Sequence, residues 1–327
     1  MKLESVIAGM LGLLPVGTYQ KIRDVLSARN RQWLVGRCDL YRCAHHKLGD
    51  LNRATKVCHI RKGLYDYQYF NICFVNNMIS LIVEAVAQGM VPRIEVINDK
   101  GENIWETFFL QPYHQIDTSQ MESVEWDLEC GKCFPAFDEI YQDRSIFLWG
   151  EMYQQFVCLN EKSKNYVDAE VQKVLGGESN ILGILCRGTD YTETKPKGHP
   201  VQPEIAEVMD YAEQKMQELG CGAIYLATED GKIDKAFRER FPGKIRINQR
   251  RYYDELFDEN GLQLIKDVHF DREDDDYWKG MEYLSSLVIL SRCESLIAGN
   301  CGGSQMAVFM NGGKYRYCKI YNLGLYQ

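Results

Sequence analysis

The residues from Ile181 to Cys186 form a short apolar run that ends at Arg187, Gly188, Thr189 and Asp190. Bounded apolar runs of this length are typical of buried strands in a parallel sheet. Ligands of open α/β sheets bind just outside the carboxyl ends of such strands. We therefore expect Arg187 to lie where a phosphate could bind. The alternative is a surface ion pair between Arg187 and Asp190 that closes a tight turn.

Short apolar runs alternate with helical patterns through the second half of the chain, which predicts a doubly wound parallel sheet. The predicted strands are 181–186, 223–227, 244–247, 296–298 and 317–321. The predicted helices are 203–219, 231–241, 277–293 and a last one that ends at Met310. A proline at the start of the first helix and a glycine at its end fit the preferences of helix termini.

The first half of the chain predicts a second, less regular α/β domain. Strands are expected over 56–61 and 91–97, and apolar residues recur at helical spacing over 78–90 between them. A further helix is expected from about Trp149 to Leu175. With a boundary near Gly176–Gly177, the predicted parts are an N-terminal α/β domain over 1–176, a C-terminal Rossmann-like domain over 177–312, and a strand and tail over 313–327.

The charge of the chain bears on its partners. Its 327 residues have a net charge of −8 and a pI of about 5.4. A protein that binds nucleic acid mainly through phosphate contacts would be basic, so we expect no nucleic-acid partner. A small phosphorylated ligand remains compatible, because one focused arginine can outweigh the overall field.

The cysteines and the N-terminus bear on location. The 12 cysteines follow no secretory signal, which indicates free thiols in a reducing cytosol and a cytoplasmic protein. The apolar run Val6–Val16 is too short to span a bilayer. It is either an amphipathic helix that touches a membrane, where a lipid-linked acceptor could lie, or a helix that docks on the domain.

Three short patterns contain metal-ligand residue types, but none has the spacing of a complete site. They are Cys130-x-x-Cys133, Cys38-x4-Cys43 with His45 and His46, and Asp274–Asp276. No second cysteine or histidine pair follows the first pattern at zinc-finger spacing, and the acidic run is typical of a solvated loop. We therefore predict no bound metal and no cofactor.

Three loops of the second half follow predicted strands and should meet in one crevice, because the carboxyl ends of parallel strands share one edge of the sheet. Their polar residues are Arg187, Thr189 and Asp190; Thr228, Glu229 and Asp230; and Asn300, Gly302, Gly303 and Ser304. A guanidinium binds phosphate oxygens as a fork, and a Gly-Gly-Ser turn exposes N–H groups to an anion. Together the loops predict a pocket for a nucleoside diphosphate with a pendant group. Alternatively, Glu229 and Asp230 cap the helix that follows them, and Gly-Gly-Ser is an ordinary turn.

The order of these segments resembles the fucosyltransferase superfamily. That group includes α1,2-, α1,6- and protein O-fucosyltransferases and bacterial enzymes that fucosylate chitin oligosaccharides. The similar segments are Arg187-Gly188-Thr189-Asp190, Leu226-Ala227-Thr228-Glu229-Asp230, Leu290-Ser291-Arg292-Cys293-Glu294, and Asn300 with Ser304-Gln305. The resemblance covers mainly residues 180–312. More loosely, Asn76–Asn77, Trp105–Glu106 and Gln111–Pro112 look like features of the first domain in bacterial relatives.

The resemblance implies a GT-B fold, in which two Rossmann-like domains with parallel sheets face a cleft. It also implies a metal-independent, inverting transfer of fucose from GDP-fucose, or of a sugar from another nucleoside diphosphate. The acceptor would be a glycan or a lipid-linked oligosaccharide in polysaccharide biosynthesis, bound on the side of the N-terminal domain.

Site residues follow from the resemblance position by position. Arg187 matches the arginine that holds the β-phosphate, and Glu229 and Asp230 match the positions that meet the nucleoside. Asn300 and Ser304, with Gln305, match the phosphate-side loop. The chain departs from the family at three positions, which are Leu185 in place of a histidine, Gly188 in place of a second arginine, and Ser286 in place of an aspartate that reads guanine.

A transferase also needs a general base or a proton relay for the acceptor hydroxyl. Glu193, Glu106 and His199 are candidates, and with Arg187 we expect Glu193 and His199 to act in catalysis. The alternative for His199 is an ordinary surface histidine. Tyr252, Arg250–Arg251 and Trp278 either line an acceptor groove or belong to a charged loop between domains.

Two functions of different class remain open at this point. The first is a glycosyltransferase with a nucleotide-sugar donor. The second is a non-catalytic relative that binds a nucleotide or glycan and has a regulatory or scaffold role, which the departures at Leu185 and Gly188 favour. An NAD-dependent enzyme fits poorly, because no Gly-x-Gly-x-x-Gly follows an early strand.

Overall fold

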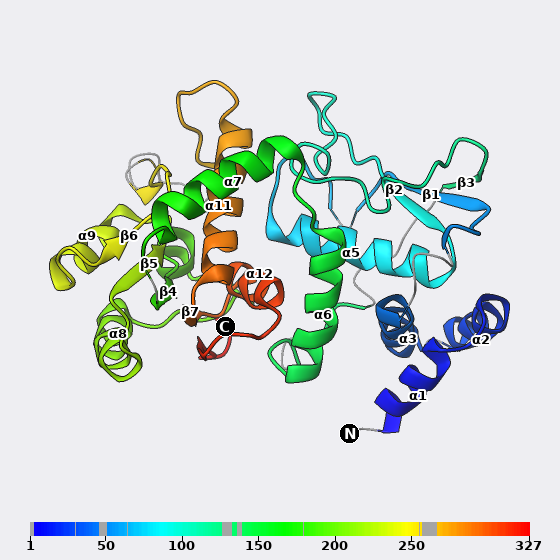
Figure 1. Ribbon diagram of the computed structural model, residues 1–327, viewed down its shortest axis with the longest axis horizontal. Helices are drawn as coiled ribbons and strands as arrows, with labels where there is room; N and C mark the ends of the chain where they lie inside the picture. The colour runs from blue at the N-terminus through cyan, green and yellow to red at the C-terminus, as the bar shows by residue number, and fades with distance from the viewer. Residues whose placement is uncertain are drawn as a thin grey trace. The chain divides into compact units, whose positions relative to one another are not determined.

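The chain forms two compact α/β units, Met1–Lys162 and Ser163–Gln327 (Figure 1). The computed structural model describes residues 3–29, 31–45, 51–63, 65–125, 133–135, 139–178, 180–254, 256 and 267–327. Each unit has its own parallel sheet, so the predicted α/β class with two parallel sheets is confirmed. No helix in these ranges is both long enough and apolar enough to cross a membrane.

The first unit builds a three-stranded parallel sheet of order β2-β1-β3. Its elements are α1 (Leu3–Gly12), α2 (Val16–Ala28), α3 (Gln32–His45), β1 (Lys56–Ile60), α5 (Ile72–Ala87), β2 (Val91–Ile94), β3 (Glu122–Glu125) and α6 (Asp143–Phe156). The predicted strand–helix–strand unit is thereby confirmed. Helix α5 begins earlier than predicted, because the side chain of Asn71 accepts a hydrogen bond from the Phe74 N–H and caps the helix there.

The helix expected from Trp149 to Leu175 is two helices, α6 and α7 (Glu161–Leu175). The chain leaves the helical path between them to meet an earlier loop of the first unit. Asn160 donates side-chain hydrogen bonds to the carbonyls of Glu106 and Thr107, at 2.8 and 3.1 Å. Tertiary contacts therefore break a pattern that helical spacing alone would continue.

The second unit is doubly wound, as predicted, with a five-stranded parallel sheet of order β6-β5-β4-β7-β8. After α7 its elements are β4 (Ile181–Leu185), a π-helical turn η1 (Asp190–Thr194), α8 (Ile205–Leu219), β5 (Ala223–Ala227), α9 (Gly231–Arg240), β6 (Ile245–Arg246), α11 (Asp275–Arg292), β7 (Ser295–Gly299), α12 (Gly302–Asn311) and β8 (Tyr317–Tyr321). The three inner strands are buried along their whole length, as their continuous apolar runs require.

Helices cover both faces of this sheet. Side chains of β4 and β5 pack with Val208, Ala212 and Met216 of α8 and with Ile233 and Phe237 of α9 on one face. Helix α11 lies on the other face, so close that a Cβ at Gly183 would meet Cys293 and Leu290 at 3.2 Å. Figure 1 shows α8 and α9 on one side of β4 and β5, with α11 on the other.

Helix α7 belongs to the second unit, which moves the boundary from the predicted Gly176–Gly177 to the start of this helix. Tyr166 of α7 contacts the ring of Trp278 at 5.9 Å, and Glu170 accepts a hydrogen bond from the Gln249 N–H at 2.5 Å. The residues 313–327 are not a separate part either, because β8 forms the edge of the five-stranded sheet. Both differences arise from long-range packing.

A buried ionic cluster ties the first helices of the first unit to its core. Asp39 of α3, only 2% exposed, accepts hydrogen bonds from the Tyr19 hydroxyl at 2.5 Å and from Arg23 at 3.1 Å. Arg23 also pairs with Glu84 of α5. Each member has a charged or polar partner, as burial of such groups requires.

We predict that Asp39→Ala destabilises the first unit by about 3–5 kcal/mol, because it leaves Arg23 and the Tyr19 hydroxyl buried with fewer partners. Asp168→Ala is the matched control, since its ion pairs with Lys164 and Arg292 are exposed and worth less than about 1 kcal/mol. Urea unfolding of both variants measures the difference. Equal stability losses would contradict the importance of the cluster.

Candidate functional site

The three polar loops that were predicted to share a crevice follow strands that end at or next to paired positions of the second unit's sheet. Leu185 of β4 pairs with Ala227 of β5 and with Ala298 of β7. Arg187, Glu229 and Asn300 therefore each lie two residues beyond the same row of the sheet. Because β5, β4 and β7 are neighbours and parallel, the structure brings these three loops together at the carboxyl edge.

Glu229 joins the loop after β5 to the loop after β4. Its carboxylate is buried, with the residue 5% exposed, and accepts a hydrogen bond from the Gly188 N–H at 2.8 Å. The Thr189 hydroxyl donates to the same oxygen at 3.4 Å, and the Nε of Arg187 lies 3.5 Å from it. Glu229 thus acts as an acceptor for the β4 loop and does not cap α9.

Asp230 is the residue that caps α9, as the alternative interpretation of this motif predicts. One of its carboxylate oxygens accepts hydrogen bonds from the N–H groups of Lys232 and Ile233, at 2.8 and 3.2 Å. A Cβ at Gly188 would lie 2.3 Å from the other oxygen. The glycine at position 188 is therefore required by the close approach of these two loops.

The β4 loop is strained where it turns away from the sheet. Thr189 has φ 41° and ψ −114°, a conformation that residues with a side chain rarely adopt, and it is 1% exposed. The π-helical turn η1 follows it at once, where the sequence predicts only a loop. Strain and π-helical turns are concentrated at functional sites, which makes this loop the leading candidate. The side chain of Asp190 lies outside the described residues.

Arg187 lies against an aromatic ring that the sequence interpretation missed. Its side chain is 15% exposed, and the guanidinium carbon lies 4.7 Å from the centre of the Tyr191 ring. The edge of His199 meets the same ring at 5.4 Å between ring centres. Arg187, Tyr191 and His199 therefore form one row, and the sequence signal for Tyr191 was its place directly after the Arg-Gly-Thr-Asp segment.

The loop that carries His199 is held by the C-terminal residues. The Gly198 N–H donates to the Tyr326 carbonyl, and the Tyr326 N–H donates to the His199 carbonyl, both at 2.9 Å. His199 is exposed, as is Glu193 in η1. Gln202, which the sequence interpretation also missed, donates to the Asn300 carbonyl at 2.9 Å and so joins this loop to the end of β7.

The loop after β7 presents backbone N–H groups to the carboxyl edge. The Ser304 hydroxyl accepts a hydrogen bond from the Cys301 N–H at 3.0 Å and donates to the Cys301 carbonyl at 2.9 Å, which closes the capping box of α12. That hydroxyl is used within its own turn and is fully buried, so it is not available to a ligand, and the start of α12 offers backbone N–H groups instead. Asn300 is 1% exposed and Gln305 is 9% exposed.

Thr228, a predicted site residue, and Cys186, which was not predicted, both have structural roles. Thr228 accepts a hydrogen bond from the Asp230 N–H at 3.2 Å, which shapes the β5 loop. Burial raises the pKa of the Cys186 thiol, directly before Arg187, far above its ordinary range. This cysteine is therefore a packing residue and not a nucleophile.

The remaining candidates lie elsewhere. Glu106 belongs to the first unit, where it accepts a hydrogen bond from Gln111 at 3.0 Å. Of the cysteine patterns, Cys38, Cys43 and Cys133 are buried free thiols, whereas Cys130 and His46 lie outside the described residues. Arg251 packs over Phe270 at 5.4 Å, and Trp278 packs on Tyr166, both in the second unit.

Within the described ranges, one group of side chains has metal-ligand spacing, formed by His269, Asp275 and Asp276. Asp275 already pairs with Arg272 at 2.7 Å, and Lys279 lies 3.4 Å from Asp275 and 3.1 Å from Asp276. Two of the protein's own cations, Arg272 and Lys279, therefore already pair with these carboxylates.

We predict that Gly188→Ala destabilises the second unit by about 2 kcal/mol, because the added methyl group would overlap the carboxylate of Asp230. Gly222→Ala is the matched control, since no atom lies within 4 Å of the position of its Cβ, and it should change stability by less than about 0.5 kcal/mol. Thermal unfolding of the two variants measures both effects. If Gly188→Ala is as stable as the parent protein, the loops after β4 and β5 can move apart at little cost, and their close approach does not require a glycine.

Comparisons with known proteins find similarity at the level of structure alone. No family model matches the sequence, and no curated protein matches it. NodZ alpha-1,6-fucosyltransferase soaked with GDP-fucose is 15% identical, with a TM-score of 0.43 over 79% of this chain and 93% of that chain. Fucosyltransferase NodZ from Bradyrhizobium is 14% identical, with a TM-score of 0.42 over 78% and 93%. POFUT1 in complex with GDP-fucose is 9% identical, with a TM-score of 0.34 over 85% of this chain and 77% of that chain.

Proposed function

We propose that this protein is a glycosyltransferase that moves a sugar from a nucleoside diphosphate to a glycan acceptor. The proposal rests on the positions of Arg187, Glu229 and Asn300. Each lies two residues beyond the same row of paired residues, at the carboxyl edge of β4, β5 and β7. A permanent cation, buried acidic groups and the N-terminus of α12 meet there, and these are the chemical groups that a nucleoside diphosphate requires.

The proposed chemistry depends on charge that develops during the reaction. When the bond between the sugar and the diphosphate breaks, negative charge grows on the β-phosphate and positive character grows on the sugar carbon. Arg187 and the N–H groups of Gly302 and Gly303 would stabilise the phosphate more in the transition state than in the ground state. These groups would do the work of a divalent metal, so the proposed reaction is metal-independent.

GDP-fucose is the donor that we propose, on the basis of the motif order around Arg187, Asp230 and Ser304. The acceptor hydroxyl would attack from the face opposite the leaving phosphate, which inverts the configuration at the sugar carbon. His199 and Glu193 are exposed and lie on the loops next to Arg187, so either can take the acceptor proton. A glycan or a lipid-linked oligosaccharide in polysaccharide biosynthesis is the proposed acceptor.

We predict that GDP raises the melting temperature of the protein more than UDP, ADP or CDP does, because a ligand that binds only the native state stabilises it. At a ligand concentration of about 100 times Kd the stabilisation is about 2.7 kcal/mol. EDTA should leave the shift unchanged. Arg187→Ala should abolish it, whereas Arg292→Ala, which removes an exposed arginine of the same unit, should not. If none of the four nucleotides raises the melting temperature, the proposal loses its basis.

We predict that Arg187→Lys lowers the rate of sugar transfer by about a hundredfold, because a point charge cannot replace a planar fork at a developing phosphate charge. Arg238→Lys is the control, since Arg238 pairs with Asp234 on the surface of α9. Rates are measured with radiolabelled GDP-fucose, with hydrolysis and transfer counted separately. Tight GDP binding without hydrolysis or transfer of any donor sugar would favour the non-catalytic alternative.

A further inference from the structure

The charge of this chain is divided very unevenly. Residues 1–62 contain twelve Lys and Arg against four Asp and Glu, a net charge of +8. Since the whole chain has a net charge of −8, residues 63–327 carry −16. Such an asymmetry is typical of a segment that binds an anionic surface.

Several of these cations are exposed and unneutralised. Within the described part of the chain, no carboxylate lies within ion-pair distance of five of them, which are Lys21, Arg29, Arg31, Arg53 and Lys62. Other basic residues of the segment do pair with acids, as Lys56 does with Glu122 and Arg37 with Glu139. The excess positive charge is therefore borne on the surface.

The same segment exposes apolar side chains on one helix. Ile7, Met10 and Leu13 follow one another at a spacing of three residues along α1 and its end, and they are 40%, 67% and 71% exposed. The opposite side of α1 is buried, as Ala8 shows with no exposure, because α1 packs against α3. Exposed apolar side chains in a segment rich in cations suit the boundary between lipid headgroups and acyl chains.

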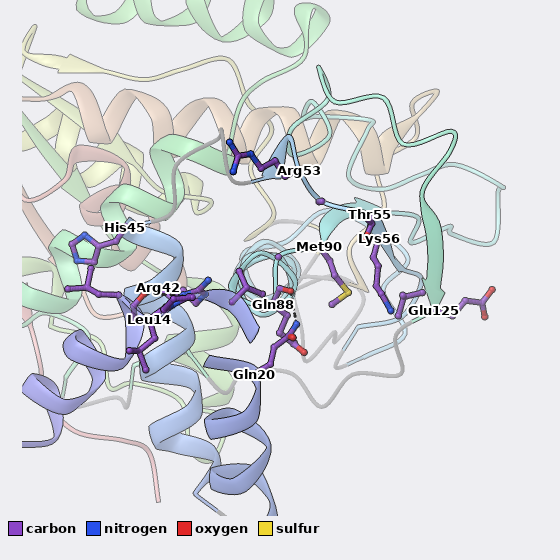
Figure 2. Close-up of a pocket in the computed structure, with 17 residues that line it drawn as sticks. Leu14, Gln20, Arg42, His45, Arg53, Thr55, Lys56, Gln88, Met90 and Glu125 are labelled. Carbon is purple, nitrogen blue, oxygen red and sulfur yellow. Dashed lines mark hydrogen bonds between the residues drawn. The ribbon is translucent and has the colours of Figure 1, made fainter. Parts of the chain in front are cut away.

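A cavity of about 1010 Å³ opens beside these residues in the first unit. It is lined by Leu13 and Leu14 after α1, by Arg42 and His45 of α3, and by Arg53. Figure 2 shows His45 and Arg42 on one side of this cavity and Lys56 and Glu125 on the opposite side. Arg53 and His45 are both exposed, so their positive or hydrogen-bonding groups are accessible from solvent.

Arg42 gives this surface a fixed shape. Its residue is 5% exposed, and its guanidinium donates hydrogen bonds to the carbonyls of Ala87 at 2.7 Å, Gly12 at 3.3 Å and Leu14. These bonds hold the turn after α1 against the end of α5. Leu13 is therefore presented at the rim of the cavity by a preorganised turn.

We propose that α1, the turn after it and the adjoining cavity dock on an anionic lipid bilayer. Met10 and Leu13, with Ile7, enter the outer part of the acyl region. Arg53 receives the phosphate of a lipid headgroup at the cavity, and Lys21, Arg29 and Arg31 add long-range attraction. The exposed apolar row favours a bilayer over a nucleic acid, which would meet the cations but give Leu13 and Met10 nothing to pack against. This surface is independent of the proposed activity.

The test is sedimentation of the intact protein with vesicles of phosphatidylcholine alone and of phosphatidylcholine mixed with phosphatidylglycerol. We expect binding to the mixed vesicles only. Raising the salt from about 0.1 M to about 1 M shortens the Debye length from about 10 Å to about 3 Å and should release most of the protein. Equal binding to both kinds of vesicle, or binding to neither, would overturn the proposal.

Variants separate the two parts of the surface. Met10→Ser with Leu13→Ser should weaken vesicle binding by at least about tenfold, and Arg53→Glu by about fivefold or more. Leu323→Ser and Lys244→Glu are the controls, because they remove an exposed apolar side chain and reverse an exposed positive charge in the second unit, and they should bind as the parent does. Unchanged melting temperatures confirm that all variants fold.

Binding of a labelled single-stranded RNA tests whether the partner of this surface is a nucleic acid. If the protein binds RNA with an affinity that Arg53→Glu lowers and the Met10→Ser, Leu13→Ser pair leaves unchanged, and if vesicles do not bind, the surface is a nucleic-acid site and the lipid proposal is wrong. Vesicle binding that depends on both the apolar row and Arg53 supports the proposal.

Discussion

The organisation of the candidate site depends on one buried carboxylate, that of Glu229. It accepts hydrogen bonds from the Gly188 N–H and the Thr189 hydroxyl, and it lies beside the Nε of Arg187. A buried carboxylate is costly unless it is paired, and its side-chain partners among the described residues, Gly188, Thr189 and Arg187, lie in the loop after β4. The position of that loop, including Arg187, the strained Thr189 and the turn η1, therefore depends on an acid from the neighbouring strand.

Some polar groups at the carboxyl edge therefore hold the loops in place and are not available to a ligand. The Gly188 N–H donates to Glu229 and so does not face an incoming phosphate. The Ser304 hydroxyl is used in the capping box of α12 in the same way. Among the described residues, the groups that the proposed site offers to an anion are the guanidinium of Arg187 and the N–H groups at the start of α12. Exclusion of water would strengthen the contacts of these groups with a diphosphate, because electrostatic interactions are stronger where the dielectric is low.

The two units differ in the surfaces that they offer. The second unit concentrates its polar groups at one sheet edge, where buried acids and one arginine are held in register. The first unit carries the excess positive charge of residues 1–62 together with the exposed row of α1. An overall charge of −8 conceals this division, and the acidic pI would by itself argue against a large anionic surface as a partner. A local field depends on which charges remain unpaired at a surface, and ion pairs such as Arg37 with Glu139 decide that only after folding.

The sequence by itself determined the parallel sheet of the second unit, because apolar runs such as 181–186 and 223–227 can be buried on both faces only in such a sheet. It also placed Arg187 and the acidic pair at one edge, since strand ends follow directly from those runs. Only the tertiary structure decided which carboxylate caps α9 and which holds the β4 loop, and that Tyr191 and Gln202 join the site. It likewise decided that α7 belongs to the second unit and that the Ser304 hydroxyl takes part in the capping box of α12. Periodicity is a local property that a sequence displays, whereas the choice of a hydrogen-bond partner depends on distances between residues that are far apart along the chain.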